Sequence, residues 1–145
     1  MSTAYQRGRR FEYRVRDHLR ERGFFVVRAA KSKGVADLIA IRRGDTPLLV
    51  QCKGGRRGGS ASLPPDEWNA LYDAALAAGA IPLLACRVKR RIRFVRLTGR
   101  KDGARREVAE AFEIVAPREN SQNSDRLSIR SKIDLSTDWL KDHIE

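Results

Sequence analysis

Three polar residues interrupt two short apolar segments in the sequence AKSKGVADLIAIRRGDTPLLVQCK. Asp37 begins the first apolar segment, and Gln51 and Lys53 stand at alternate positions near the end of the second. Because side chains alternate along a strand, Gln51 and Lys53 would share one face of a sheet. An acid, an amide and an ammonium at this spacing suggest a small metal site that faces a phosphate.

Glu12 is a second candidate carboxylate. It lies in a predicted helix over residues 4–22, whose apolar residues recur every four positions, and Gly23 suits the end of that helix. Glu12 projects from the edge of the apolar face, where a carboxylate is costly unless it is paired or binds a metal. A metal ligand and a rim salt bridge, to Arg9 or Arg16 for example, both fit this position.

The residue types match the chemistry of phosphodiester cleavage. Mg²⁺ prefers oxygen ligands and usually keeps several waters. Asp37 and Glu12 are candidate anionic ligands, and the Gln51 side-chain carbonyl and the Cys52 backbone carbonyl are candidate neutral ones. Lys53 would orient the attacking water or stabilise the transition state.

Each of these residues also has an ordinary structural interpretation. Asp37 fits a strand-entry aspartate, Gln51 a polar position on an edge strand, and Lys53 a strand-end lysine that reaches solvent. Ser32, in the loop before Asp37, is a candidate contact to the scissile phosphate and is equally typical of a loop serine. The metal-site hypothesis predicts a hairpin register that places Asp37 opposite Lys53 and Ile39 opposite Gln51.

The overall charge favours a polyanionic partner. The chain has 145 residues and a formal net charge of +12, with the positive excess confined to residues 1–117. Nucleic acid is the default partner for such a field, and a soluble basic protein without such a partner is the alternative. No apolar segment approaches the roughly 20 residues of a membrane span, and no secretory signal is evident, so we expect a cytoplasmic protein with no membrane contact.

The cysteines and histidines argue against a zinc site. Cys52 and Cys86 lie in separate apolar segments without a CxxC pairing, which is typical of buried reduced thiols. His18 and His143 are too far apart in the sequence to form a typical zinc motif.

The hydrophobic pattern predicts a mixed α/β sheet of about five strands flanked by helices. A second helix begins at Pro64-Pro65 and ends at Gly79, and a further short helix fits residues 104–112. The connection through the second helix is long enough for a crossover, which makes the two strands beside it parallel. The predicted strands are residues 24–29, 37–43, 48–53, 82–88 and 92–97.

The composition changes near Pro117. Residues 1–116 are predicted to form one domain, and residues 117–145 a polar linker and C-terminal tail. A disordered tail and a short helix after Ser136 that docks on a partner or on its own domain are both compatible with this sequence.

The chain resembles the PD-(D/E)xK nuclease superfamily, most closely the archaeal-type (Hjc-like) Holliday junction resolvases and their phage relatives. The resemblance covers about residues 5–97 and is carried by GRRFEYRVRDHLRERGFFVVRAAKSKGVADLIAIRRGDTPLLVQCK with the helix and strand that follow. It implies a restriction-endonuclease-like fold and an endonuclease that resolves four-way junctions with Mg²⁺, with Mn²⁺ as a substitute. By this match the helix glutamate is Glu12, the strand-opening aspartate Asp37, the xxK segment Gln51-Cys52-Lys53 and the loop serine Ser32.

Two positions depart from the family pattern. Ala36 stands where the family has a proline, and Gln51 replaces the acidic ligand. Mrr-like nucleases look similar in using QxK, so the amide is compatible with activity. It removes one negative charge, which would weaken Mg²⁺ binding and make Glu12 more important.

The resemblance also implies a homodimer that binds branched DNA in the cytoplasm, at the nucleoid or in the host of a phage. The cluster Arg87, Lys89, Arg90, Arg91 and Arg93 would extend the basic surface. The residues that would contact phosphates beside the site are Arg7, Arg9, Arg10, Lys31, Lys33, Arg56 and Arg57.

Other functions fit the same residues. The alternative enzyme is a restriction-type or nicking nuclease that acts on duplex DNA. A non-catalytic DNA-binding protein with a decayed site is the alternative outside enzymes, and Gln51 is the residue that favours it. RNA binding is less well supported, because most aromatic residues fall at predicted core positions.

Overall fold

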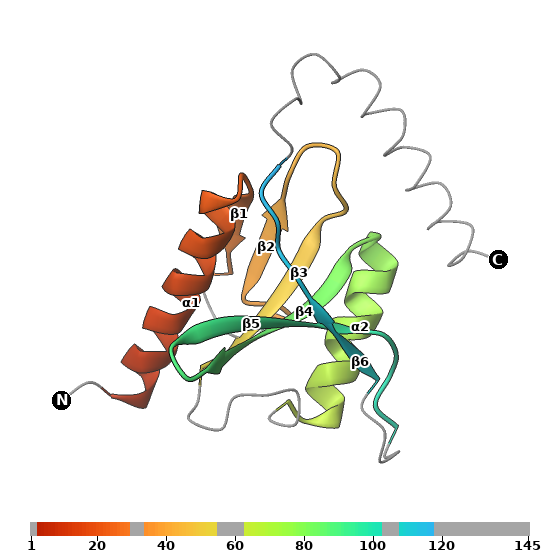
Figure 1. The fold of residues 1–145 in the computed structure, drawn as a ribbon. Helices are drawn as coiled ribbons and strands as arrows, with labels where there is room; N and C mark the ends of the chain where they lie inside the picture. The colour runs from red at the N-terminus through yellow and green to blue at the C-terminus, as the bar shows by residue number, and fades with distance from the viewer. Residues whose placement is uncertain (1–2, 30–33, 55–62, 103–107, 118–145) are drawn as a thin grey trace.

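The computed structural model describes residues 3–29, 34–54, 63–102 and 108–117. In these segments the chain forms two helices and a six-stranded sheet (Figure 1). The elements, in order, are α1 (Ala4–Glu21), β1 (Phe25–Arg28), β2 (Leu38–Ile41), β3 (Leu48–Lys53), α2 (Pro65–Ala78), β4 (Ile81–Val88), β5 (Arg91–Leu97) and β6 (Ala109–Phe112).

The strands follow the order β1-β2-β3-β4-β5-β6 across the sheet. Neighbouring strands are antiparallel except β3 and β4, which α2 connects as a parallel pair. The predicted mixed α/β sheet and its parallel crossover are therefore confirmed, with six strands in the described segments instead of about five.

The predicted short helix at 104–112 is wrong where the structure describes it. Ala109–Phe112 is instead strand β6, which pairs with β5 along its whole length. The edge of β5 offers a row of backbone hydrogen-bonding groups, whereas a helix of this length is marginal in water. Thr98 continues the pairing, because its N–H donates to the Val108 carbonyl.

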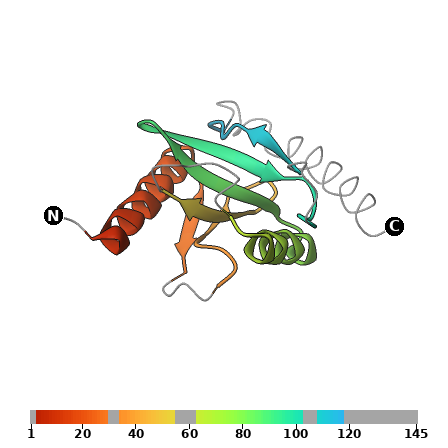
Figure 2. The same cartoon turned by 90° about the horizontal axis from the view of Figure 1, so that it is seen from below.

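The two helices cover opposite faces of the sheet. Alternate residues of β4 belong to different cores: Leu83 and Ala85 pack in the core under α1, and Leu84 and Cys86 in the core under α2. Figure 2 shows the sheet between the red helix α1 and the green helix α2. Positions that alternate along a strand therefore face different helices.

Helix α1 is fixed at both ends by local sequence. Thr3 and Gln6 form a capping box at its start. Gly23 follows its end with φ of 87°, a left-handed conformation that favours glycine. Phe11, Val15 and Leu19 form its buried stripe, as the four-residue spacing predicts.

Helix α2 is anchored by Trp68. Its side chain is fully buried, and its Nε1–H donates to the Gly99 carbonyl at 2.8 Å. Pro64 is the N-cap residue, and Gly79 ends the helix in the left-handed conformation with φ of 67°. Both boundaries agree with the sequence prediction, so the first turn of α2 has a fixed place beside the sheet.

The register of the β2–β3 hairpin differs from the predicted one. Leu38 pairs with Val50 and Ala40 with Leu48, so Ile39 is opposite Leu49 instead of Gln51. Residues 42–47 connect the strands, and the Asp45 N–H donates to the Arg42 carbonyl within this turn. The longer turn shifts the pairing by two residues, and a shift of two leaves the paired residues of β2 and β3 on the same faces of the sheet as the predicted register does.

Gly54 allows α1 to approach the end of β3. A Cβ atom at Gly54 would lie 2.8 Å from Cβ and Cγ of Phe11. No side chain larger than hydrogen fits there unless the helix moves. The position of Glu12, the residue after Phe11, therefore depends on this contact.

Gly54→Ala is expected to lower the free energy of unfolding by about 1–3 kcal/mol, because it overpacks the contact with Phe11. Chemical denaturation measures this change. Gly8→Ala is the matched control, since a Cβ at Gly8 meets nothing within 4 Å, and it should stabilise the helix by about 0.5–1 kcal/mol. Equal stability of Gly54→Ala and the wild type would contradict the close contact.

Candidate active site

Asp37 is held between β1 and β3 by its backbone and by its side chain. Its N–H donates to the Val50 carbonyl, and its carbonyl accepts from the Ala29 N–H, both at 2.9 Å. Its Oδ2 accepts a hydrogen bond from the Cys52 N–H at 2.8 Å. The carboxylate is thus fixed where β2 begins and β3 ends.

The charge on Asp37 is under opposing influences. Burial raises the pKa of the carboxyl above its ordinary value of 3.8, and the nearby Glu12 carboxylate raises it further. The hydrogen bond from Cys52 and the positive charges of Lys53 and Arg28 act in the opposite direction without cancelling the rise. A cation bound here would relieve both the burial and the repulsion between the carboxylates.

Glu12 forms an ion pair with a residue that the sequence did not point to. Its Oε2 lies 3.0 Å from Nε of Arg28, at the end of β1, and both side chains are mostly shielded from solvent. The expectation of a rim salt bridge to Arg9 or Arg16 is therefore wrong in the choice of partner. Arg28 shares the α1 side of β1 with Val26, and only this strand alternation could have indicated it.

Gln51 and Lys53 lie toward the α2 side of β3. Leu49 packs in the core under α2, whereas Val50 and Cys52 pack in the core under α1. By alternation Gln51 and Lys53 share the face of Leu49. This agrees with the position of Lys53 Nζ, which lies 3.8 Å from Oε2 of Glu67 in the first turn of α2.

Cys52 contributes its backbone and not its thiol. Burial and the nearby carboxylates raise the pKa of the Cys52 thiol, so it stays protonated at neutral pH and is a poor metal ligand. Neither Cys52 nor Cys86 forms a disulfide, as the sequence predicts.

The residues present fit a hard divalent cation. Two carboxylates, an amide oxygen and a backbone carbonyl are the oxygen donors that Mg²⁺ uses, together with retained waters. In the segments that the structure describes, no cluster of three or more His, Cys, Asp or Glu side chains could hold a metal. The candidate donors therefore include only two negatively charged groups, the carboxylates of Glu12 and Asp37.

Several predicted DNA contacts lie outside the described residues. These are Ser32 with its neighbours Lys31 and Lys33, and Arg56 and Arg57 after β3. The arginines of the first turns of α1, Arg7, Arg9 and Arg10, are described and exposed.

A basic groove lies on the α1 side of the molecule. It has a volume of about 920 Å³ and lies between α1, the β4–β5 hairpin and β6. Arg14 of α1 donates to the Arg90 carbonyl at 3.0 Å, which ties the hairpin to the helix. The groove combines apolar side chains with the basic residues Arg22, Lys89, Arg90, Arg91 and Arg93.

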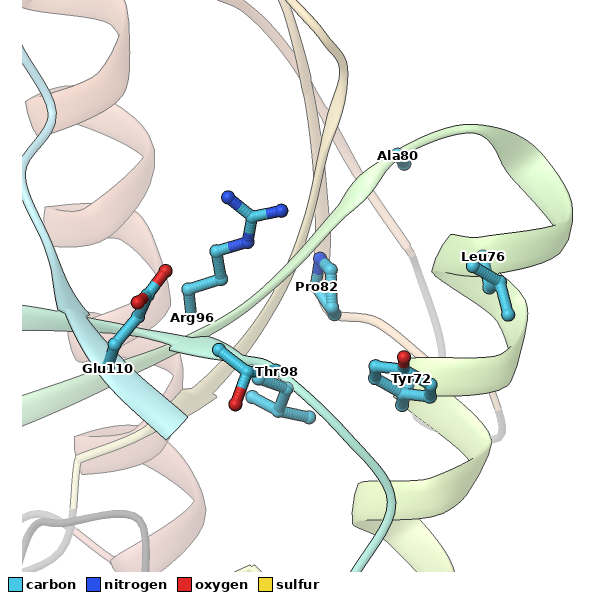
Figure 3. A pocket seen from close by; sticks show the side chains of 8 residues that line it. Tyr72, Leu76, Ala80, Pro82, Arg96, Thr98 and Glu110 are labelled. Atoms are coloured by element: carbon cyan, nitrogen blue, oxygen red, sulfur yellow. The ribbon is translucent and has the colours of Figure 1, made fainter. Parts of the chain in front are cut away.

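A second pocket lies on the other side of the sheet. It has a volume of about 210 Å³ and is lined by residues of α2, β4, β5 and β6 (Figure 3). Tyr72 and Leu76 come from α2, and Arg96 and Glu110 are opposite each other on β5 and β6. None of the predicted site residues lines it, so it is separate from the candidate active site.

Comparison with known proteins identifies the family. The family model described as archaeal Holliday junction resolvase (Hjc) matches residues 3–122. The chain belongs to this family. The resemblance inferred from the sequence is thereby confirmed, and the family match extends through β6.

Two members of the Hjc family are similar to the chain. The crossover junction endodeoxyribonuclease Hjc of Methanocaldococcus jannaschii is 45% identical over 53 residues, which are 37% of this chain and 38% of that protein. The structure of Archaeoglobus fulgidus Hjc, described as a Holliday junction resolvase, superimposes with a TM-score of 0.51 at 28% identity. That match covers 60% of this chain and 70% of the other.

The helices of the described segments are α1 and α2. None of these helices is long and apolar enough to span a membrane.

Asp37→Asn is expected to change how stability depends on pH. The pKa of Asp37 is raised in the folded state, so folding favours the protonated carboxyl. The stability that this protonation contributes is fully present below the ordinary pKa of about 3.8, and it is lost as pH rises through the raised pKa of the folded state. With a chelator present, the wild type should therefore lose stability relative to Asp37→Asn as the pH rises from the ordinary value of 3.8 through the raised pKa of the folded state. Denaturation curves at several pH values measure this difference, and parallel pH profiles would contradict the raised pKa.

Proposed function

We propose that this chain is a metal-dependent endonuclease that resolves four-way (Holliday) DNA junctions by phosphodiester hydrolysis. The observation that carries the proposal is the fixed Asp37 carboxylate, which accepts from the Cys52 N–H and is influenced by the charges of Glu12 and Lys53. Membership of the Hjc family supports this assignment. The aligned segment spans 38% of the M. jannaschii protein, so the activity of that relative is carried over here only as a proposal.

Each site residue has a proposed role. Glu12, Asp37, the Gln51 amide oxygen and the Cys52 backbone carbonyl would hold Mg²⁺, or Mn²⁺ in its place. When bound, the metal lowers the pKa of a coordinated water and polarises the phosphate. Lys53 would donate to a non-bridging phosphate oxygen and offset the negative charge that develops during attack.

The fixed hydrogen bond of Asp37 would orient one carboxylate oxygen and leave the other for the metal. Cys52 donates to Oδ2, so Oδ1 is the oxygen available for coordination. Because this carboxylate is partly buried, part of its hydration is removed before the metal binds. Ser32 remains a proposed phosphate contact that lies outside the described residues.

The basic surfaces fit a substrate recognised by shape. The exposed arginines of α1 and the β4–β5 hairpin would contact phosphates, which gives affinity without reading base sequence. A four-way junction presents more phosphates to such a broad surface than one duplex arm does. The structure-selective substrate is therefore favoured over linear duplex DNA.

We also propose a homodimer that uses the β1–β2 hairpin. Four apolar residues are exposed on one face of this hairpin: Phe25 (70%), Val27 (44%), Ile39 (37%) and Ile41 (46%). Phe25 is opposite Ile41 and Val27 opposite Ile39, so the four form one continuous patch. A self-complementary patch of this kind suits a two-fold interface, and it would set a fixed spacing between two active sites.

Cleavage of a labelled four-way junction with Mg²⁺ or Mn²⁺ tests the proposed activity. Asp37→Asn and Lys53→Ala should each lower the cleavage rate by at least about a hundredfold, because Asp37 would hold the metal and Lys53 would offset the charge on the reacting phosphate. Junction affinity should stay within about threefold of wild type, since phosphate contacts elsewhere supply it.

Linear duplexes with the same arm sequences are the substrate control. Faster cleavage of these duplexes than of the junction would support a restriction-type or nicking nuclease instead. Junction binding by the wild type without nicking in either metal would support a non-catalytic DNA-binding protein, the alternative that Gln51 favours.

Arg91→Ala combined with Arg93→Ala tests the basic surface. The pair should weaken junction binding and reduce the slope of log affinity against log salt by about 0.9 per lost phosphate contact. Fluorescence anisotropy over a salt series measures both quantities. Arg100→Ala is the matched control, because Arg100 forms an ion pair with Asp73 and is not part of the β4–β5 hairpin. Equal salt slopes for the double variant and this control would show that the hairpin does not contact DNA phosphates.

A further inference from the structure

Glu67 is the acid nearest to Lys53 among the ion pairs of the described residues. Its Oε2 lies 3.8 Å from Lys53 Nζ, and its side chain is about half exposed. The distance is that of an ion pair and not of a hydrogen bond, so the two groups interact mainly through their charges. In the sequence, Glu67 has only the role of an acid in the first turn of a helix.

The charges around Asp37 indicate why this acid matters. The charged groups that act on Asp37 are Glu12, Lys53 and Arg28. Together with Asp37 itself, these two acids and two bases give no net charge, and Gln51 adds none. A site that takes a divalent cation and a phosphate needs an excess of negative charge before the cation arrives.

Glu67 lies on the side of the sheet where an acid at position 51 would act. Gln51 and Lys53 share the α2 face of β3, and Glu67 comes from α2 itself. Glu12 comes from α1 on the opposite face, and Figure 2 shows both helices beside the sheet. Carboxylates from the two helices therefore approach the end of β3 from opposite sides.

The position of Glu67 is fixed by its neighbour in the sequence. Trp68 is fully buried and hydrogen-bonded to Gly99, so the first turn of α2 is anchored against the sheet. This leaves the Glu67 side chain to adjust while its backbone stays in place. Such an arrangement suits a residue that must keep its charge beside Lys53.

We propose that Glu67 is a positioning residue that supplies the negative charge missing at Gln51. This inference rests on the proposed metal-dependent activity. Glu67 holds the Lys53 ammonium at the end of β3 and restores a negative balance to the site. It acts through its ion pair with Lys53, whose positive charge it offsets, without direct coordination of the metal.

A purely structural explanation makes a different prediction. Acids in the first turn stabilise a helix through its dipole, and Asp66 and Glu67 both occupy that turn. If this were the whole role of Glu67, removal of either charge would have the same consequences. Asp66→Asn is therefore the matched control for Glu67→Gln.

The test measures Mn²⁺ binding by calorimetry on the full chain without DNA, together with metal-dependent junction cleavage. Glu67→Gln is expected to raise the Mn²⁺ dissociation constant about fivefold and to lower cleavage at subsaturating metal, as expected for loss of one partly screened charge. Asp66→Asn should stay within about twofold of wild type in both measurements. Gln51→Glu combined with Glu67→Gln should restore wild-type Mn²⁺ affinity.

Two results would overturn the inference while the proposed function stands. One is a Glu67→Gln variant that matches Asp66→Asn in Mn²⁺ affinity and cleavage. The other is a double variant that gains nothing from Gln51→Glu. If the wild type itself neither binds Mn²⁺ nor cuts a junction, the proposed function and this inference both fail.

Discussion

The hydrogen bond from the Cys52 N–H to the Asp37 carboxylate, at 2.8 Å, is the constraint on which the site depends. It joins the first residue before β2 to the end of β3, so a change in the pairing of these strands would move both metal-ligand candidates. The bond favours the ionised carboxylate, whereas burial and the Glu12 charge disfavour it. Asp37 is thus a carboxylate whose ionised form is disfavoured by its surroundings, and a bound cation would offset that unfavourable energy.

Because a helix covers each face of the sheet, residues from distant segments reach the surroundings of this carboxylate. Alternate residues of β3 face different helices, so Cys52 packs under α1 while Lys53 reaches Glu67 of α2. Gly54 permits the close contact with Phe11 that sets the position of α1. The positions of the charged groups therefore depend on Gly54 and on the alternation of side chains along β3, as well as on the charged residues themselves.

Much of the fold follows from local sequence. The four-residue apolar spacing of α1 and the proline and glycine that bound α2 give both helices, and the length of the crossover gives the parallel strand pair. The hairpin register was two residues off because the turn over residues 42–47 folds into a longer connection. The segment before Phe112 was misassigned because pairing with the edge of β5 decides its conformation.

The site was only partly predictable for a similar reason. Polar residues in apolar strands drew attention to Asp37, Gln51 and Lys53. Arg28 and Glu67 were missed, because their roles arise from tertiary pairing with Glu12 and Lys53. Gln51 is visible in the sequence, but the ion pair between Lys53 of β3 and Glu67 of α2 is visible only in the fold.

We propose that Glu12 and Asp37 together hold a divalent cation at the ends of β2 and β3. Anomalous diffraction from crystals of the chain soaked in Mn²⁺ tests it most directly. If both carboxylates bind the cation, an anomalous peak will lie within coordination distance of each of them. A fully soaked crystal with no peak at these carboxylates, or with its Mn²⁺ bound elsewhere, would contradict it.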